Sequence, residues 1–316
     1  MIYPKITGLV AAPFTPFCSN GELNLKKIEL QAQHLIDQGV SGAFVCGTTG
    51  EGFSLTIEER VKITEQWINI AKKDLKIVVH VGHPCLQESK ELAKHAQQMG
   101  AHAFSATPTS CFKSPTVQDL VEYAAEIAAS APKLPFYYYH IPFFSGVAFK
   151  ISEFLEIAES KIPNLAGIKF TNEDLMDYGL SLQFQKKKFD LLFGRDEILL
   201  GGLAFGAEGA VGSTYNFMAP LYLRMIEAWK SGALEEAQRL QYTAQKIIAV
   251  GLCHGGLPAF KEILKIVGID LGPVRKPLRA FPPQTTKVLE EQLEKVGFFK
   301  YATHGLHKRE ILVSQK

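Results

Sequence analysis

The 316-residue sequence has little net charge and no apolar run of membrane-spanning length. Its 34 Lys and Arg residues nearly balance 32 Asp and Glu residues, which leaves a formal charge of +2. So small a charge gives no long-range attraction to nucleic acid or to an anionic membrane, and we expect neither as a partner. No apolar run reaches the roughly 20 residues of a membrane-spanning helix. The first residues also lack the basic-then-apolar layout of a signal peptide.

Paired cysteines are absent as well. The sequence has an odd number of cysteines, none of them in a C-x-x-C pair: Cys18, Cys46, Cys85, Cys111 and Cys253. We therefore expect no disulfide framework. Such a set favours a reducing compartment, and we expect a cytoplasmic protein.

The common nucleotide and metal motifs are missing. No G-x-G-x-x-G follows the first apolar strand-like run, and the Gly47–Gly52 loop is not followed by G-K-[ST]. Within the strand–helix repeats His80 and His83 form one close histidine pair, without a carboxylate in the same segment, whereas a catalytic metal needs about three converging ligands. We expect no bound metal and interpret His80 as a hydrogen-bonded interior residue. A metal-dependent aldolase that uses this pair is an open alternative.

Strand-like and helical segments alternate through most of the chain. The strand-like runs lie at 8–13, 42–47, 76–82, 102–107, 135–142, 165–171, 190–195 and 209–214. Several are continuously apolar, which is typical of parallel strands covered on both faces. Helical periodicity lies between them, as at 25–38, 57–73 and 87–99. The repeats predict a (β/α)8 TIM barrel, with a doubly wound open sheet as the alternative.

Only helices are expected after the eighth strand. The pattern predicts helices at 217–230, 233–251, 258–267 and 283–297. We therefore predict three parts. They are a barrel over residues 1–230 that carries the active site, a C-terminal helical extension over 231–300, and a tail over 301–316 with no assigned structure.

In such a barrel the active site lies at the C-terminal ends of the strands. Five strand ends supply polar groups: the Gly47–Gly52 loop, Tyr139, Lys169, Gly194 with Asp196 and Glu197, and Ser213. Asp196 and Glu197 have a second interpretation, as acidic residues that complement a helix N-terminus.

Lys169 is the sharpest of these candidates because it lies inside an apolar strand. Burial of an ammonium group is costly, so the pKa of such a lysine falls toward the neutral amine. A neutral amine attacks carbonyls and forms Schiff bases. A lysine that extends to solvent is the alternative for this residue alone. Its place among the other polar groups favours the imine.

The Gly47–Gly52 loop and Tyr139 suit the same chemistry. The loop offers backbone N–H groups and two hydroxyls, which predicts a site for an anion such as a substrate carboxylate. Thr56 and Glu59 beyond it match a helix capping box. A phenol at the end of the Phe136–Tyr139 strand could relay protons, while at least two of that strand's aromatic residues are expected to pack.

Four motifs together resemble the pyruvate-dependent aldolase superfamily, which contains N-acetylneuraminate lyases and dihydrodipicolinate synthases. They are G-T-T-G-E-G at 47–52, Y-H-I-P at 139–142, G-I-K at 167–169 and G-S-T-Y-N at 212–216. The resemblance runs from Gly8 to about Phe299 and includes G-P-V-R-K-P-L at 272–278. The chain looks most like the lyases, through F-G-R-D-E at 193–197. It also has Phe144 where the synthases carry an arginine for a second carboxylate.

The resemblance implies an activity and residue roles. Lys169 would form the imine, Tyr139 would relay protons, and Thr48 and Thr49 would hold the pyruvate carboxylate. The sugar end would meet Thr171, Gly194, Asp196, Glu197 and Ser213. The implied reaction is reversible cleavage of N-acetylneuraminate (a sialic acid) to N-acetylmannosamine and pyruvate by a homotetramer, with no cofactor and only a small-molecule substrate as partner.

Two alternatives share this resemblance. One is a lyase for a 2-keto-3-deoxy sugar acid or a 4-hydroxy-2-oxo acid, and the other is a catalytically silent relative that binds a sugar acid. Many relatives also place a tyrosine after the fourth strand, where it reaches a neighbouring subunit's site. Residues 109–113 contain none, so the proton relay is expected to run differently here.

Overall fold

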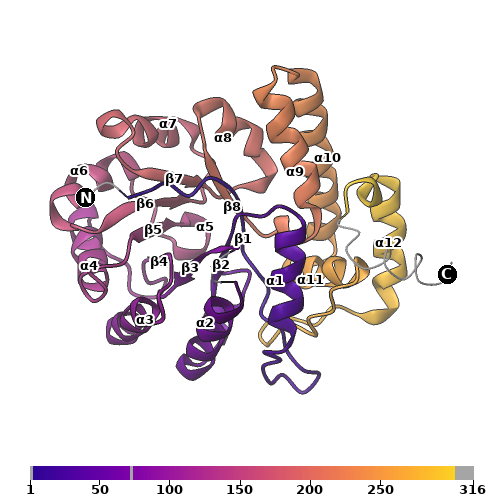
Figure 1. The fold of residues 1–316 in the computed structure, drawn as a ribbon, viewed down its shortest axis with the longest axis horizontal. Helices are drawn as coiled ribbons and strands as arrows, with labels where there is room; N and C mark the ends of the chain where they lie inside the picture. The colour runs from indigo at the N-terminus through magenta and orange to yellow at the C-terminus, as the bar shows by residue number, and fades with distance from the viewer. Residues whose placement is uncertain (1–2, 72–73, 303–316) are drawn as a thin grey trace.

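The computed structural model describes residues 3–71 and 74–302, and within them eight parallel strands close into a barrel (Figure 1). The strands follow one another in chain order, and β8 pairs with β1. They are β1 (Gly8–Ala11), β2 (Gly42–Val45), β3 (Lys76–His80), β4 (Ala103–Ala106), β5 (Phe136–His140), β6 (Leu165–Phe170), β7 (Asp190–Phe193) and β8 (Gly209–Gly212). The predicted (β/α)8 barrel is confirmed, and the open sheet is excluded.

All eight predicted strands are present, but each prediction runs one or two residues too far at its C-terminal end. Some of the extra residues are apolar, such as Ala12 and Ile141, and others are polar, such as Thr107 and Thr171, but in each case the ladder has stopped and the backbone turns into the loops of the barrel mouth. After β2, for example, Cys46 has a left-handed φ of 58°. The overrun residues are therefore those that lead into the candidate site.

Helices surround the barrel. They are α1 (Lys27–Asp37), α2 (Ile57–Ala71), α3 (Leu86–Met99), α4 (Val117–Ala129), the short α5 (Pro142–Ser145), α6 (Ile151–Lys161), α7 (Leu175–Gln183), α8 (Leu199–Phe205) and α9 (Tyr215–Lys230). The end of the helix predicted at 57–73 lies outside the described residues. The capping box before α2 is confirmed, because Thr56 N–H donates to Glu59 Oε2 at 3.0 Å and Glu59 N–H donates to Thr56 Oγ1 at 3.2 Å.

Because side chains along each strand point alternately into and out of the barrel, the protein has two hydrophobic cores. Val10, Phe44, Tyr137 and Leu192 belong to the core inside the barrel. The alternate positions, such as Ile168, pack outward against the helices. Because every second side chain points inward, Tyr139 and Lys169 enter the barrel interior from neighbouring strands.

Residues 231–300, which we call the extension, lie beside α9 at one side of the barrel (Figure 1). They contain α10 (Leu234–Cys253), α11 (Leu257–Ile266) and α12 (Thr286–Lys295), which agree with the predicted helices. Of the predicted tail only Tyr301 and Ala302 are described.

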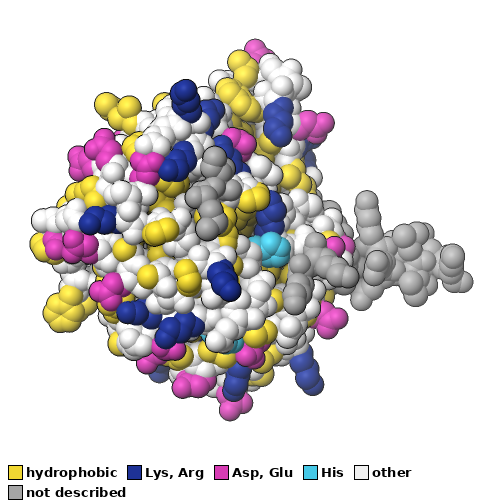
Figure 2. Space-filling view, turned by 60° about the vertical axis from the view of Figure 1, so that its left-hand side comes forward, with side chains coloured by type: hydrophobic (Ala, Val, Ile, Leu, Met, Phe, Trp, Pro, Cys, Tyr) yellow, Lys and Arg dark blue, Asp and Glu magenta, His cyan; other side chains and the backbone are white. Residues whose placement is uncertain are grey.

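In the described part of the chain no single helix is long and apolar enough to cross a membrane. Helices α10 and α11 satisfy that test only as a pair, bent by 114°. On the face shown in Figure 2, Lys and Arg side chains are interspersed with Asp and Glu.

Candidate active site

Lys169 lies inside the barrel at the C-terminal end of β6, with 4% of its surface exposed. Its Nζ stands 3.8 Å from the centroid of the Phe44 ring and 3.9 Å from that of Tyr139. Burial lowers the pKa of Lys169 from 10.5 to about 7, although the charge of Asp196 opposes the shift. A substantial fraction of the amine is therefore neutral at physiological pH and is a competent nucleophile.

Tyr139 is the neighbour of Lys169 on β5, because the two residues pair directly in the β5–β6 ladder. Its hydroxyl lies 3.4 Å from Thr48 Oγ1, in the loop that follows β2. Burial raises the pKa of Tyr139 to about 12, so the phenol keeps its proton in the free protein. The other two tyrosines of the strand have packing partners, as expected. Tyr137 donates to Asp190 at 2.9 Å, and Tyr138 stacks on Phe154.

The Gly47–Gly52 loop places two hydroxyl residues, Thr48 and Thr49, in the wall of the same cavity. Within the loop Glu51 N–H donates to Thr48 O at 3.0 Å and Gly52 N–H donates to Gly47 O at 3.1 Å. Among the described residues the N–H groups of Thr48 and Thr49 have no acceptor. Free N–H groups beside hydroxyls suit a carboxylate.

All nine residues predicted for the site line one cavity of about 140 Å³ at the mouth of the barrel: Thr48, Thr49, Tyr139, Lys169, Thr171, Gly194, Asp196, Glu197 and Ser213. The predicted residues, which come from five different strand ends, are thus brought together in one place.

Asp196 connects the ends of β7 and β8 in the wall of the cavity. It is buried, and its Oδ2 accepts from Thr214 N–H at 2.9 Å and from Thr214 Oγ1 at 2.6 Å, which ties the end of β7 to the end of β8. Burial, reinforced by the nearby charge of Glu197, raises the pKa of Asp196. A Cβ at Gly212 would lie 1.9 Å from Asp196 Oδ1, so the close packing of these strand ends requires glycine.

Several lining residues were not predicted. Thr214, Arg195, and Ile248 of α10 and Phe260 of α11 also face the cavity. Arg195 lay within the F-G-R-D-E motif and could have been found from it. Ile248 and Phe260 occupy ordinary apolar positions of helices, so only the packing of α10 and α11 next to the cavity identifies them.

The charges at the mouth are largely paired. Arg195 forms ion pairs with Glu173 and, at 3.8 Å, with Glu197. Phe144, at the position where the synthases carry an arginine, lines the cavity with 61% of its surface exposed. Among the described lining residues, Lys169 is the one cation without a carboxylate ion pair.

The two close histidines do not converge. His80 is buried and its Nδ1 donates to Cys46 O at 3.2 Å, as expected of an interior residue. Burial holds its pKa well below 6.5. His83 Nδ1 instead accepts from Cys85 N–H at 3.0 Å. In residues 3–71 and 74–302 no three His, Cys, Asp or Glu side chains are grouped as metal ligands would be.

A (β/α)8 barrel that buries a lysine amine against a phenol and a hydroxyl loop at its strand ends has the arrangement of an imine-forming aldolase. Comparison with known proteins narrows this class. The chain belongs to the dihydrodipicolinate synthetase family, whose model matches residues 5–296.

Two similar curated proteins and one similar solved structure are all N-acetylneuraminate lyases. N-acetylneuraminate lyase of Xenopus tropicalis is 45% identical over 278 residues, which is 87% of this chain and 91% of that protein. The lyase of Rattus norvegicus is 41% identical over 308 residues, covering 95% of this chain and 96% of the relative. Among solved structures, the N-acetylneuraminate lyase of Proteus mirabilis superposes with a TM-score of 0.91 at 40% identity, over 93% of this chain and all of that one. The predicted family and fold are confirmed.

Proposed function

We propose that the protein reversibly cleaves N-acetylneuraminate to N-acetylmannosamine and pyruvate through an imine on Lys169. The observation that carries the proposal is the Lys169 amine, buried beside Tyr139 with a pKa of about 7. Family membership and the lyases among the relatives support the same activity.

The reaction begins when the neutral Lys169 amine adds to the 2-oxo carbon of the open-chain acid and water leaves. The resulting iminium withdraws electrons, so the C3–C4 bond can break once the 4-hydroxyl loses its proton. Because the pKa of Tyr139 is about 12, the phenol is not a free phenolate. It takes up the substrate proton as it passes its own, through the Thr48 hydroxyl, to the substrate carboxylate. Cleavage leaves the aldehyde N-acetylmannosamine and an enamine on Lys169. The same relay returns the proton to the enamine carbon, and hydrolysis releases pyruvate and the free lysine. The imine is the electron sink, so we propose no cofactor and no metal.

The two sides of the cavity divide the substrate between them. Thr48 and Thr49 would hold the pyruvate carboxylate with hydroxyl and N–H groups. Polar residues from β6, β7 and β8 would face the sugar: Thr171, Gly194, Asp196, Glu197 and Ser213. Arg195 is engaged by glutamates and Phe144 is uncharged, which supports a neutral polyol over a second carboxylate.

We also propose that the enzyme is a cytoplasmic homotetramer whose partner is its small-molecule substrate alone. Membership of the family supports the assembly, and the absence of paired cysteines from the sequence supports a reducing compartment. Residues 231–300 are proposed as an extension to a barrel over residues 1–230.

Borohydride trapping tests the proposal. Reduction in the presence of pyruvate should attach a three-carbon adduct to the peptide that contains Lys169, as read by mass spectrometry, and Lys169→Ala should remain unlabelled and inactive. An unmodified Lys169, or full activity in Lys169→Ala, would contradict it.

Substrate choice is measured separately. Pyruvate release, coupled to lactate dehydrogenase, should be faster from N-acetylneuraminate than from 2-keto-3-deoxygluconate. The reverse order would assign the chain to another lyase of the family. Failed trapping with EDTA-sensitive activity would indicate a metal aldolase, and stabilisation by ligand without turnover would indicate a silent relative.

A further inference from the structure

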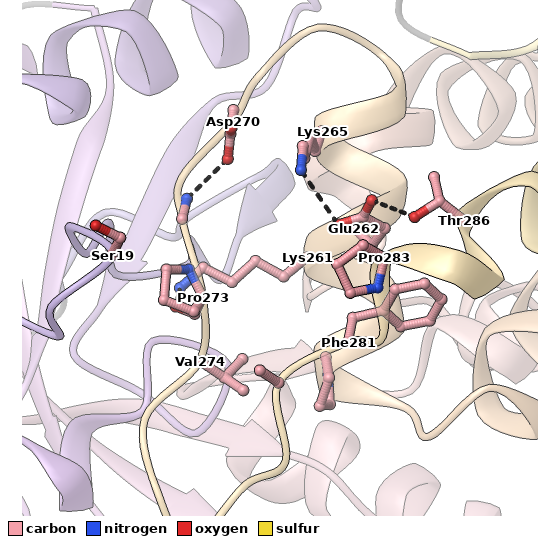
Figure 3. Close-up of a pocket in the computed structure, with 13 residues that line it drawn as sticks. Ser19, Lys261, Glu262, Lys265, Asp270, Pro273, Val274, Phe281, Pro283 and Thr286 are labelled. Carbon is pink, nitrogen blue, oxygen red and sulfur yellow. Dashed lines mark hydrogen bonds and ion pairs between the residues drawn. The ribbon is translucent and has the colours of Figure 1, made fainter.

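A buried ion pair connects the C-terminal extension to the threonine loop of the site. Lys261 of α11 and Glu51 of the Gly47–Gly52 loop approach to 3.4 Å, with only 3% and 1% of their side-chain surfaces exposed. Lys261 Nζ also donates to Thr15 O at 2.8 Å and to Pro273 O at 2.6 Å, so each of its three N–H groups has an acceptor. Figure 3 shows its side chain running from α11 toward Pro273, along a cavity of about 400 Å³.

The acceptors of Lys261 are themselves attached to the loop. Thr15, whose carbonyl accepts from Lys261, donates through its Oγ1 to Gly50 O at 2.6 Å. Glu51 has a left-handed φ of 55°, and its N–H donates to Thr48 O. Lys261 therefore reaches the residues immediately after Thr48 and Thr49 by two routes, one through Glu51 and one through Thr15.

A second part of the extension completes the arrangement. Arg275, in the G-P-V-R-K-P-L segment, donates its backbone N–H to Glu51 Oε2 at 2.7 Å. Its guanidinium is bidentate to Glu59 of α2, with both contacts at 2.5 Å. Both Lys261 and Arg275 also lie over the ring of Phe17. Each oxygen of the Glu51 carboxylate is thus held by a different part of the extension.

Stability alone does not account for a charged pair at this place. Desolvation offsets most of the attraction within a buried ion pair, and well-packed apolar residues in place of such a pair are often equally stabilising. What the ion pair adds is a fixed orientation of Glu51. Its carboxylate is held from two sides, while its backbone has a left-handed conformation that is unusual for a residue with a side chain.

We propose that Lys261 and Glu51 are positioning residues of the active site. They hold the Thr48–Thr49 loop so that its hydroxyl and N–H groups meet the carboxylate of the 2-oxo acid. This inference rests on the proposed imine chemistry and adds that the extension determines how tightly that carboxylate is bound.

The test compares pyruvate with pyruvamide, which keeps the ketone and replaces the carboxylate by a neutral amide. Half-saturating concentrations for borohydride trapping at Lys169 are measured in the wild type, Lys261→Met and Glu51→Gln. Lys265→Met is the matched control, because Lys265 lies one turn away on α11, lines the same cavity and is half exposed. The double variant E51Q/K261M, which leaves neither charge buried alone, serves if the single variants do not fold.

A misplacement of about 1 Å can reduce activity by about 10²-fold. We therefore expect Lys261→Met and Glu51→Gln to raise the half-saturating concentration of pyruvate roughly tenfold, that of pyruvamide less than about twofold, and KM for N-acetylneuraminate more than they lower kcat. Lys265→Met should match the wild type in all three. Equal changes for pyruvate and pyruvamide, or no change in the folded variants, would overturn the inference. Failure of the wild type to trap pyruvate would instead refute the proposed function.

Discussion

The pKa of Lys169 can be tested through the charge of Asp196. Relative to an ordinary lysine at 10.5, a pKa of about 7 means that the folded protein disfavours the ammonium form by about 5 kcal/mol. Roughly half of the amine is then neutral at pH 7, compared with about one part in 3,000 for an exposed lysine. Asp196 opposes this shift because its carboxylate stabilises the nearby ammonium group.

Asp196→Asn removes that charge and retains an oxygen that can accept from Thr214. We expect the pKa of Lys169 to fall, and with it the midpoint of the pH profile for pyruvate trapping. The wild-type midpoint should lie near pH 7 and the variant midpoint below it, by less than about one pH unit, because burial raises the pKa of Asp196 to about 7 and its carboxylate is only partly charged at the midpoint. Pyruvate lacks the sugar, so the measurement is independent of any contact between Asp196 and the polyol.

Initial rates of imine trapping between pH 5 and 10 provide the measurement, with Glu208→Gln as the control. Glu208 pairs with Lys5 at the opposite end of the barrel, so its removal should leave the profile unchanged. A wild-type midpoint above pH 9, or an upward movement in Asp196→Asn, would refute the electrostatic reasoning.

Three further predictions concern stability and the shape of the cavity. Lys169→Met should raise the free energy of unfolding by a few kcal/mol at pH 7. The folded-state pKa of the lysine lies below its unfolded value, so this gain is complete below pH 7 and is lost as the pH rises toward 10.5. Urea titrations at several pH values measure it, and a gain independent of pH would contradict it. Gly194→Ala should abolish sugar cleavage but spare pyruvate trapping, because the added Cβ would lie 2.1 Å from Thr171 Oγ1 on the sugar side; equal loss of both activities would be the contrary result. Thr116→Ala should cost about 1 kcal/mol by removing the capping box that Thr116 forms with Asp119 before α4, while kcat and KM stay at wild-type values; unchanged urea stability would argue against the cap.

The sequence predicted the barrel and the strand-end residues well because both depend on local pattern. Continuous apolar runs identify strands covered on both faces, and a polar residue at the end of such a run lies at the barrel mouth. Lys169 and Tyr139 were accessible in this way. Thr214 was not, since its role depends on the approach of Asp196 from the preceding strand end.

The contributions of the extension could not be predicted by the same means. Lys261 and Glu51 are 210 positions apart, and neither sequence neighbourhood indicates a partner for the other. Phe260 has the pattern of an apolar position in an amphipathic helix, and it lines the cavity only because α11 packs beside α9 and α10. Such contacts are set by how separate elements dock, which local periodicity does not encode.

The docking of α10 has a consequence for how such enzymes can be recombined. Gln241 of α10 donates to the carbonyls of Asp196 and Glu197 at 3.2 and 3.0 Å and accepts from Leu200 N–H at 2.8 Å. The extension therefore contacts the threonine-loop side of the cavity through Lys261 and the Asp196–Glu197 side through Gln241. A chimera joined after α9 would replace both sets of contacts at once. A barrel and an extension from different relatives therefore have to be compatible at the Lys261 and Gln241 contacts before a substrate range can be transferred.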